Sequence, residues 1–267
     1  MRRAAAWVLG GMLLTAAAVA FWPGHDFALQ DRDAVFAGAS ALHRAGTDGL
    51  GRDRAMRCAV ALLLSLAGSV LASGLTTSIA AGIGIGAAVA PRIVAGGLTL
   101  VSDAFLTLPW LFLLMMVRSG LSLTASPLQT ATVTFGLLGL LGWPACARAV
   151  YRGSRHLLRS DAMTYGRGAG FTKWQLIRTH VVPHLSPLLL PQFLVCVPAF
   201  IMAEANLGTL GLGVAEPLPS WGSMLFELES SALLMQSRWV YLPVALLVVV
   251  LLLMDTITAM PARRVDG

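Results

Sequence analysis

Residues 58–90 read CAVALLLSLAGSVLASGLTTSIAAGIGIGAAVA, an apolar run that contains no charged side chain. About 20 helical residues cross the apolar core of a bilayer, so this run can span a membrane and is too long for one straight span. We expect its glycine-rich end, with Gly82, Gly84 and Gly86, to tilt, bend or pack tightly against a neighbour. The stretch therefore predicts an all-α integral membrane protein.

The composition of the whole chain agrees with this prediction. Of 267 residues, 57% are hydrophobic and 12% are charged, and the mean hydropathy is +0.75. Soluble globular proteins carry about 25% charged residues, and a surface so poor in charge would aggregate in water. The net charge of +6 is not gathered into a basic stretch interleaved with aromatic residues, so we expect the lipid bilayer and no nucleic acid as a partner.

Apolar runs long enough to span a bilayer recur along the chain and predict about six transmembrane helices. The predicted spans are 4–22, 58–90, 93–117, 128–150, 185–205 and 239–260. The first run also resembles a signal peptide, because Arg2 and Arg3 precede it and small residues end it. Its full length favours a retained helix, and cleavage would leave the remaining topology unchanged.

The charges in the connecting segments predict the orientation. With the N-terminus and the C-terminus both inside, the inner segments hold twelve basic and two acidic residues, while the outer segments hold seven basic and eight acidic residues. Basic residues concentrate on the cytoplasmic side of membrane proteins, so this orientation is favoured. It places the segments 23–57 and 206–238 outside and the basic segment 151–184 inside. We expect the latter to be a docking surface for a soluble partner.

The sequence of the inner segment predicts its local structure. Residues 161–183 read DAMTYGRGAGFTKWQLIRTHVVP. Gly170 followed by Thr172 predicts the end of one helix and the N-cap of the next. We expect a short second helix to run to His180 and a new element to begin at Pro183.

Two stretches in the predicted outer segments also have distinctive sequence patterns. Residues 46–53 read GTDGLGRD, which by itself predicts a glycine-rich loop with an aspartate turn. Residues 203–225 read AEANLGTLGLGVAEPLPSWGSML.

Together these stretches resemble the permeases of ATP-binding-cassette importers, in the branch that handles dipeptides, oligopeptides and nickel. Residues 161–183 resemble the loop that couples such permeases to their ATPases, with Gly170 and Pro183 at the matching separation and His180 in a His-Ile-Leu-Pro-like ending. The loop's usual Glu-Ala-Ala is replaced by Thr164, Tyr165 and Gly166, which puts its charged contact to the ATPase in doubt. The two outer stretches, together with Asp103 and Pro109, are similar to the second permease type of this branch, in the right order from about residue 43 to 226.

The resemblance implies the fold, the partners and the location. It implies the type I importer permease fold with a cytoplasmic coupling-helix loop, in a bacterial inner membrane. The expected division is an N-terminal helix and external segment at 1–57, a core transmembrane domain at 58–260 and a cytoplasmic tail at 261–267, where the family's usual ending is missing. The implied partners are a homologous permease subunit, two cytoplasmic ATPase subunits and an extracytoplasmic solute-binding protein. ATP and Mg²⁺ would bind to the ATPases, so we expect no cofactor in this chain.

Charged residues inside the membrane are the other candidate sites. Asp103 and Glu204 would each either be satisfied by a partner within the protein or line the translocation path. Asp255 would lie at the cytoplasmic interface. The chain has no phosphate-binding loop, no HExxH or GxSxG motif and no metal-ligand spacing, so we expect neither a catalytic nor a metal site.

Two functions remain open from the residues alone. The first is the importer permease, of which the substrate, whether peptide, nickel complex, glutathione or opine, cannot be read from the sequence. The second is a secondary transporter driven by an ion gradient, with Asp103 or Glu204 as its ion site. Copurification with ATPase subunits would distinguish them.

Overall fold

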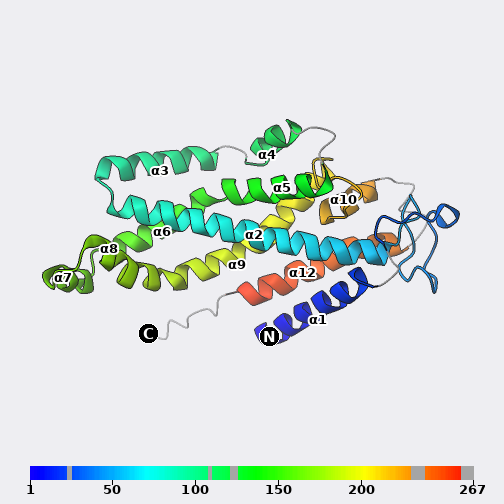
Figure 1. Cartoon of the computed structure of the whole chain (residues 1–267), viewed down its shortest axis with the longest axis horizontal. Coiled ribbons are helices and arrows are strands. Elements are labelled where there is room, and N and C mark those ends of the chain that lie inside the picture. Colours follow the sequence, from blue (N-terminus) through cyan, green and yellow to red (C-terminus); the bar gives the residue numbers. More distant parts are fainter. Residues whose placement is uncertain (23–25, 108–109, 121–125, 230–237, 260–267) are drawn as a thin grey trace, which may run out of the picture. The chain divides into compact units, whose positions relative to one another are not determined.

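A computed structural model describes residues 1–22, 26–107, 110–120, 126–229 and 238–259 (Figure 1). Helices dominate these residues, and the β-type pairing found among them is an isolated bridge between Thr47 and Asp53. The all-α fold class is therefore confirmed. The α-helices are α1 (Arg2–Ala20), α2 (Arg54–Val89), α3 (Arg92–Thr107), α4 (Trp110–Ser119), α5 (Pro127–Leu141), α6 (Trp143–Leu157), α7 (Asp161–Gly168), α8 (Lys173–Leu176), α9 (Val182–Thr209), α10 (Trp221–Phe226) and α12 (Leu242–Thr258).

Each predicted span coincides with helix. Among the described residues, five helical stretches are long and apolar enough to cross a membrane: 2–20, 54–89, 127–157, 173–209 and 239–258. The predicted span 93–117 coincides with α3 and α4, which lie on either side of residues 108–109; Pro109 itself is outside the described residues. The span predicted at 128–150 is longer than expected, because α5 and α6 follow one another with only Gly142 between them.

Helix α2 is one continuous helix of 36 residues. At 1.5 Å per residue it is about 54 Å long, well beyond the roughly 30 Å of a bilayer core. Within its glycine-rich end, Gly84 packs tightly against a neighbour, which is one of the predicted alternatives: a Cβ on Gly84 would lie 2.7 Å from Cβ of Val150. A Cβ on Gly82 or Gly86 would meet no atom within 4 Å. The helix begins at Arg54, four residues before the apolar run, because its first turns are stabilised by polar contacts described below.

The chain forms two compact units. The first comprises Met1–Ser69, Arg118–Thr134 and Pro198–Gly267, and the second comprises Val70–Val117 and Phe135–Val197. Helices α2, α4, α5 and α9 contribute residues to both.

In the first unit, the two ends of the described chain meet. Helix α1 lies beside α12 (Figure 1), and the guanidinium group of Arg2 donates to the carbonyl of Ile257 at 2.6 and 2.9 Å. The start of α1 and the end of α12 are thus on the same side, as the predicted topology requires. Asp255 is exposed close to the end of α12. The predicted tail 261–267 lies outside the described residues.

In the second unit, α3 packs against α6. The rings of Phe105 and Trp143 are 5.8 Å apart between centroids, and Thr76 of α2 donates to the carbonyl of Gly139 at 2.7 Å. Cys146 of α6 and Cys196 of α9 are half-buried neighbours, with Sγ atoms 3.9 Å apart.

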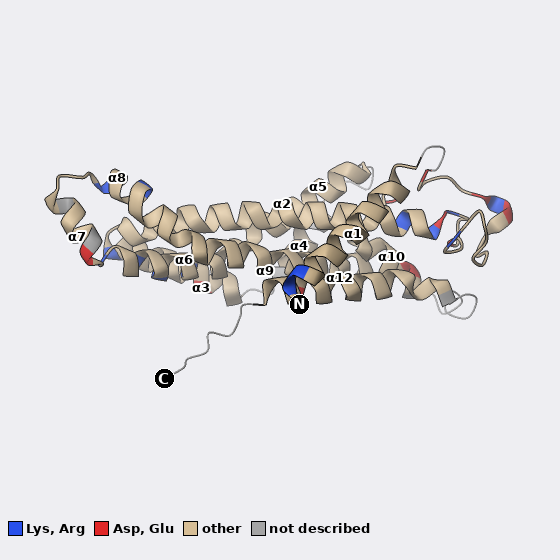
Figure 2. Cartoon of the chain, turned by 90° about the horizontal axis from the view of Figure 1, so that it is seen from below, with Lys and Arg blue, Asp and Glu red and all other residues tan. Residues whose placement is uncertain are grey.

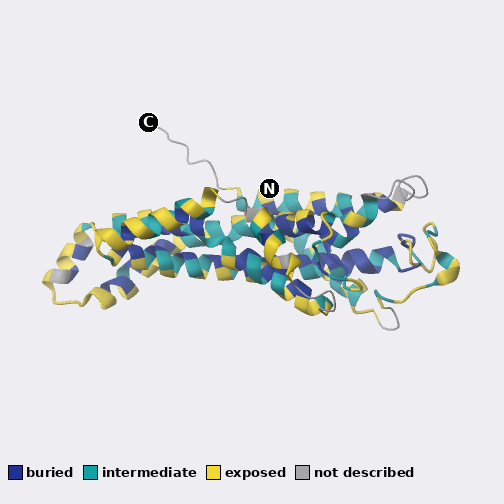
Figure 3. Ribbon diagram, turned by 90° about the horizontal axis from the view of Figure 1, so that it is seen from above, coloured by how far each residue is buried: buried dark blue, intermediate teal, exposed yellow. Residues whose placement is uncertain are grey.

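The long helices carry their charges near their ends and in the connections (Figure 2). Exposed residues are frequent along these helices (Figure 3), and many are large and apolar, such as Trp7, Leu14 and Leu100. Such surfaces are costly in water and fit lipid or an apolar neighbour.

Candidate functional site

The inner segment folds into a helix, a tight turn and a second helix, as predicted. Helix α7 ends at Gly168, and Gly170 adopts φ +83°, a left-handed conformation that residues with a Cβ rarely take. The hydroxyl of Thr172 then accepts from the N–H of Gln175, while the Gln175 side chain accepts from the N–H of Thr172. This capping box satisfies the exposed donors at the start of α8.

The predicted start of a new element at Pro183 lies one residue from the start of α9 at Val182, but the helix is not interrupted there. Helix α8 passes through a π-helical turn at Ile177–Val181 directly into α9, so that residues 173–209 form one helical stretch. Proline disrupts an α-helix because it lacks an N–H and crowds the preceding turn. Here the N–H of Val182 donates to the carbonyl of Ile177, five residues earlier, and this wider turn immediately before Pro183 accommodates the proline.

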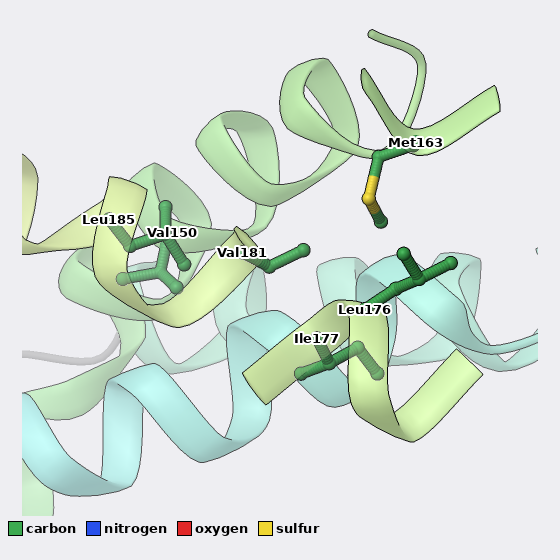
Figure 4. Close-up of a cluster of buried hydrophobic side chains, with 6 residues drawn as sticks. All are labelled: Val150, Met163, Leu176, Ile177, Val181 and Leu185. Atoms are coloured by element: carbon green, nitrogen blue, oxygen red, sulfur yellow. The ribbon is translucent and has the colours of Figure 1, made fainter. Parts of the chain in front are cut away.

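A buried apolar cluster supports the turn from beneath. It brings together Val150, Met163, Leu176, Ile177, Val181 and Leu185 from α6, α7, α8, the π turn and α9 (Figure 4). Gly166 is part of this packing, because a Cβ at this position would lie only 2.5 Å from Cδ2 of Leu176. The third residue of the altered Glu-Ala-Ala triplet therefore faces inward.

The first two residues of the triplet face solvent. Asp161, Thr164 and Tyr165 are exposed, whereas Met163 and Gly166 are buried, so α7 has one inner and one outer face. His180 is half-buried, with Nδ1 2.7 Å from the hydroxyl of Thr179, and Pro183 is exposed. Phe171 and Trp174 are also exposed, by 48% and 70%, and were not among the predicted site residues. The presence of two aromatic residues in a basic loop could have indicated them.

Asp103 has a cationic partner. In the second unit, Arg148 of α6 donates to Oδ1 of Asp103 on α3, beside the Phe105–Trp143 ring pair. An intramembrane carboxylate is costly unless it is paired, and this arginine supplies the pair. The contact favours the structural role for Asp103.

Glu204 is satisfied by neutral donors. In the first unit its side chain is fully buried, Oε2 accepts from the Ser65 hydroxyl at 3.1 Å, and Oε1 accepts from the N–H of Gly222 at 3.2 Å. Helix α10 approaches α9 closely here, since a Cβ on Gly208 would overlap the backbone of Gly222. Glu204 therefore joins α9, α2 and the start of α10, which also favours a structural role.

The outer stretch 46–53 is a loop, as predicted. It also carries charged residues whose ion-pair partners were not predicted from the sequence. Asp48 accepts from the N–H groups of Leu50 and Arg52 at 2.9 and 2.8 Å, which is the expected aspartate turn. Arg52 then pairs with three carboxylates: Asp48 at 2.6 Å, Glu216 at 2.5 Å and Glu227 at 3.3 Å.

Arg57, in the first turn of α2, completes this ion-pair network. Its side chain is fully buried, and it pairs with Glu227 at 2.8 Å, Glu216 at 3.0 Å and Asp48 at 3.4 Å. Burial raises the pKa of Glu227, while the charge of Arg57 acts in the opposite direction. The network joins the two outer motifs across about 160 residues of sequence, a separation that no local pattern reveals.

Comparison with known proteins identifies the family. Residues 78–267 match the family described as binding-protein-dependent transport system inner membrane component. The chain belongs to this family. A Brucella suis protein named as a candidate peptide permease is 31% identical over 212 residues, which cover 79% of this chain and 68% of the relative.

Two further relatives carry transport-system names. The glutathione transport system permease protein GsiD of Pectobacterium atrosepticum is 27% identical over 86% of this chain and 76% of its own length. The oligopeptide transport system permease protein OppC of Salmonella typhimurium is 31% identical over 46% of this chain and 40% of its own length.

The chain is thus an inner-membrane permease subunit of an ATP-binding-cassette importer, with the type I permease fold, and it is a transport protein, not an enzyme. Such a permease works with an ATPase and a binding protein. The alternative of a secondary transporter finds no support among these relatives.

Proposed function

We propose that this permease imports peptides or a related small solute, and that residues 161–183 couple it to a cytoplasmic ATPase. The observation that carries the coupling role is the geometry of this segment. An exposed tip is held by the left-handed Gly170, the Thr172 capping box and the apolar cluster beneath. A rigid, exposed and basic tip is suited to transmit movement from a partner into α6 and α9.

The proposed assembly contains this chain, a homologous permease, two ATPase subunits and an extracytoplasmic binding protein. ATP and Mg²⁺ bind to the ATPases, and both termini of this chain lie in the cytoplasm. The contacts of Asp103 and Glu204 within their units support structural roles for both. The names of the relatives support peptides as the substrate class.

Reconstitution tests this proposal. The complex purified through a tag on this chain should take up a labelled dipeptide or tripeptide into liposomes only with ATP and the binding protein present. Uptake driven by a proton or sodium gradient without ATP would contradict the importer function. ATP-dependent uptake of another solute would keep the importer and reject the substrate class.

A further inference from the structure

A pocket of about 490 Å³ opens in the first unit, where the two outer motifs meet. Its lining includes Asp48, Leu50, Arg52, Glu216, Phe226 and Glu227. All of them belong to segments that the charge distribution places outside the membrane. The proposed coupling mechanism gives this pocket no role.

The charges around the pocket are layered. The side chains of Arg52 and Arg57 are 6% and 0% exposed, whereas those of Glu216 and Glu227 are 46% and 27% exposed. Arg54 is buried as well and lines a separate, much smaller pocket beside Glu227. An approaching molecule therefore meets carboxylate oxygens first, held in place by guanidinium groups beneath them. The accessible charges of the pocket are thus carboxylate oxygens, each already paired with buried guanidinium groups, and a cation can add to them at contact distance.

Apolar side chains border the same pocket. Leu50 and Phe226 are each 49% exposed, although both lie on connecting segments and not on the long membrane helices. Large apolar groups beside fixed charges are typical of a surface that a protein partner covers. A lysine or arginine side chain matches both features, because its aliphatic stem packs on apolar groups while its charged head reaches carboxylates.

We propose that this pocket seats a lysine or arginine side chain of the extracytoplasmic solute-binding protein. The occupant follows from charge complementarity and from the family, in which transport depends on a binding protein that has to reach the outer face. Glu216 and Glu227 hold the cationic head, Leu50 and Phe226 pack around the stem, and Arg52 and Arg57 fix the carboxylates. This inference rests on the proposed importer function and on the proposed orientation.

Photo-crosslinking in intact cells tests the proposal. The photoreactive amino acid p-benzoylphenylalanine replaces Phe226, or in a second strain Leu50, and the adducts are identified by mass spectrometry. The expected adduct joins this chain to a solute-binding protein at a peptide that contains lysine or arginine. Glu216→Gln combined with Glu227→Gln should lower the yield roughly tenfold, because charge-assisted contacts become neutral ones. The matched control Asp33→Asn, an exposed acidic residue of the same outer segment, should leave the yield unchanged.

The remaining outcomes separate the possible failures. An adduct with the homologous permease alone, or a yield that the double glutamine variant leaves unchanged, would overturn the proposal. If the glutamine variant does not reach the membrane, Leu50→Ser with the probe at Phe226 keeps the ion pairs and should still lower the yield; an unchanged yield again overturns the proposal. ATPase copurification is measured in parallel: a chain that retains ATPases and forms no binding-protein adduct rejects only this inference, whereas loss of ATPases rejects the proposed function.

Discussion

At the scale of single residues, Gly170 determines the shape of the coupling segment. Its φ of +83° lets the chain reverse between α7 and α8, and no neighbouring atom lies within 4 Å of the position that a Cβ would take. The requirement is therefore conformational and not steric. A residue with a Cβ in this conformation costs about 1–2 kcal/mol.

We predict that Gly170→Val abolishes coupled uptake while the subunit still inserts into the membrane. Valine adds β-branching to the unfavourable φ, so the turn should rearrange and displace Phe171 and Thr172. Gly168→Ala is the matched control, since that position is also open but has no positive φ. Uptake and ATPase copurification are measured together. Wild-type values in Gly170→Val would contradict the role of Gly170 in shaping the coupling segment.

Glu204 is the second residue whose role can be tested by single substitutions. We predict that Glu204→Ala lowers the free energy of unfolding in detergent by about 1–3 kcal/mol, because the Ser65 hydroxyl and the Gly222 N–H lose a buried acceptor. Glu204→Gln keeps an acceptor and should cost less. Asp255→Ala, at an exposed position, controls for removal of a carboxylate. Equal melting temperatures for the Ala and Gln variants would argue against this role.

At the scale of elements, the outer face of α7 determines what the partner meets. Thr164 occupies the position where related permeases are expected to carry the glutamate of Glu-Ala-Ala, and Asp161 is exposed one turn earlier, on the same side as Thr164. We hypothesise an asymmetric importer, in which the partner permease keeps the acidic residue and this chain makes a changed or weaker ATPase contact. The alternative is that Asp161 supplies the charge.

Two substitutions distinguish these alternatives. If the importer is asymmetric, Thr164→Glu should change ATPase activity and subunit association, and Asp161→Ala should have little effect. A charge-assisted hydrogen bond contributes about 1.5–3 kcal/mol, enough to alter association measurably. Loss of coupling in Asp161→Ala alone, with no change in Thr164→Glu, would leave the displaced charge as the explanation.

The sequence predicts the elements well where local patterns decide them. The Gly170–Thr172 boundary follows from the left-handed glycine and the N-cap, and both were confirmed. The start of α2 could not be predicted, because Arg54 and Arg57 precede the apolar run and the buried Arg57 pairs with Asp48, Glu216 and Glu227, two of which are distant in sequence. The boundary near Pro183 was predicted, but the uninterrupted passage from α8 through the π turn into α9 was not, because a π turn leaves no recognisable pattern in a single sequence.

At the scale of the whole molecule, charge distribution predicts the orientation, and the Arg2–Ile257 contact places the start of α1 and the end of α12 on the same side. We predict that an impermeant thiol reagent labels Ala39→Cys and spares Ala169→Cys in intact cells. Both positions are exposed, and the native cysteines are replaced beforehand. The reverse labelling pattern would place the coupling segment outside and reject the topology.

The residue contacts that define the candidate sites could not be predicted from sequence patterns. Hydropathy and motifs give the spans, the sidedness and the family resemblance. The partners of Asp103 and Glu204 are Arg148 and Ser65, from helices distant in sequence, so either role was open until the fold was known. The outer pocket likewise forms only when residues 46–53 meet residues 208–227.

Subunit association tests the central claim most directly, namely that this permease couples to ATPases through residues 161–183. A tagged chain carrying Tyr165→Cys, at a side chain that is 78% exposed, is treated with a short bifunctional thiol crosslinker in membranes, purified and analysed by mass spectrometry. We predict an adduct with an ATP-binding-cassette ATPase and copurification of a homologous permease. A chain that purifies without any ATPase, and whose introduced thiol crosslinks to none, would contradict it.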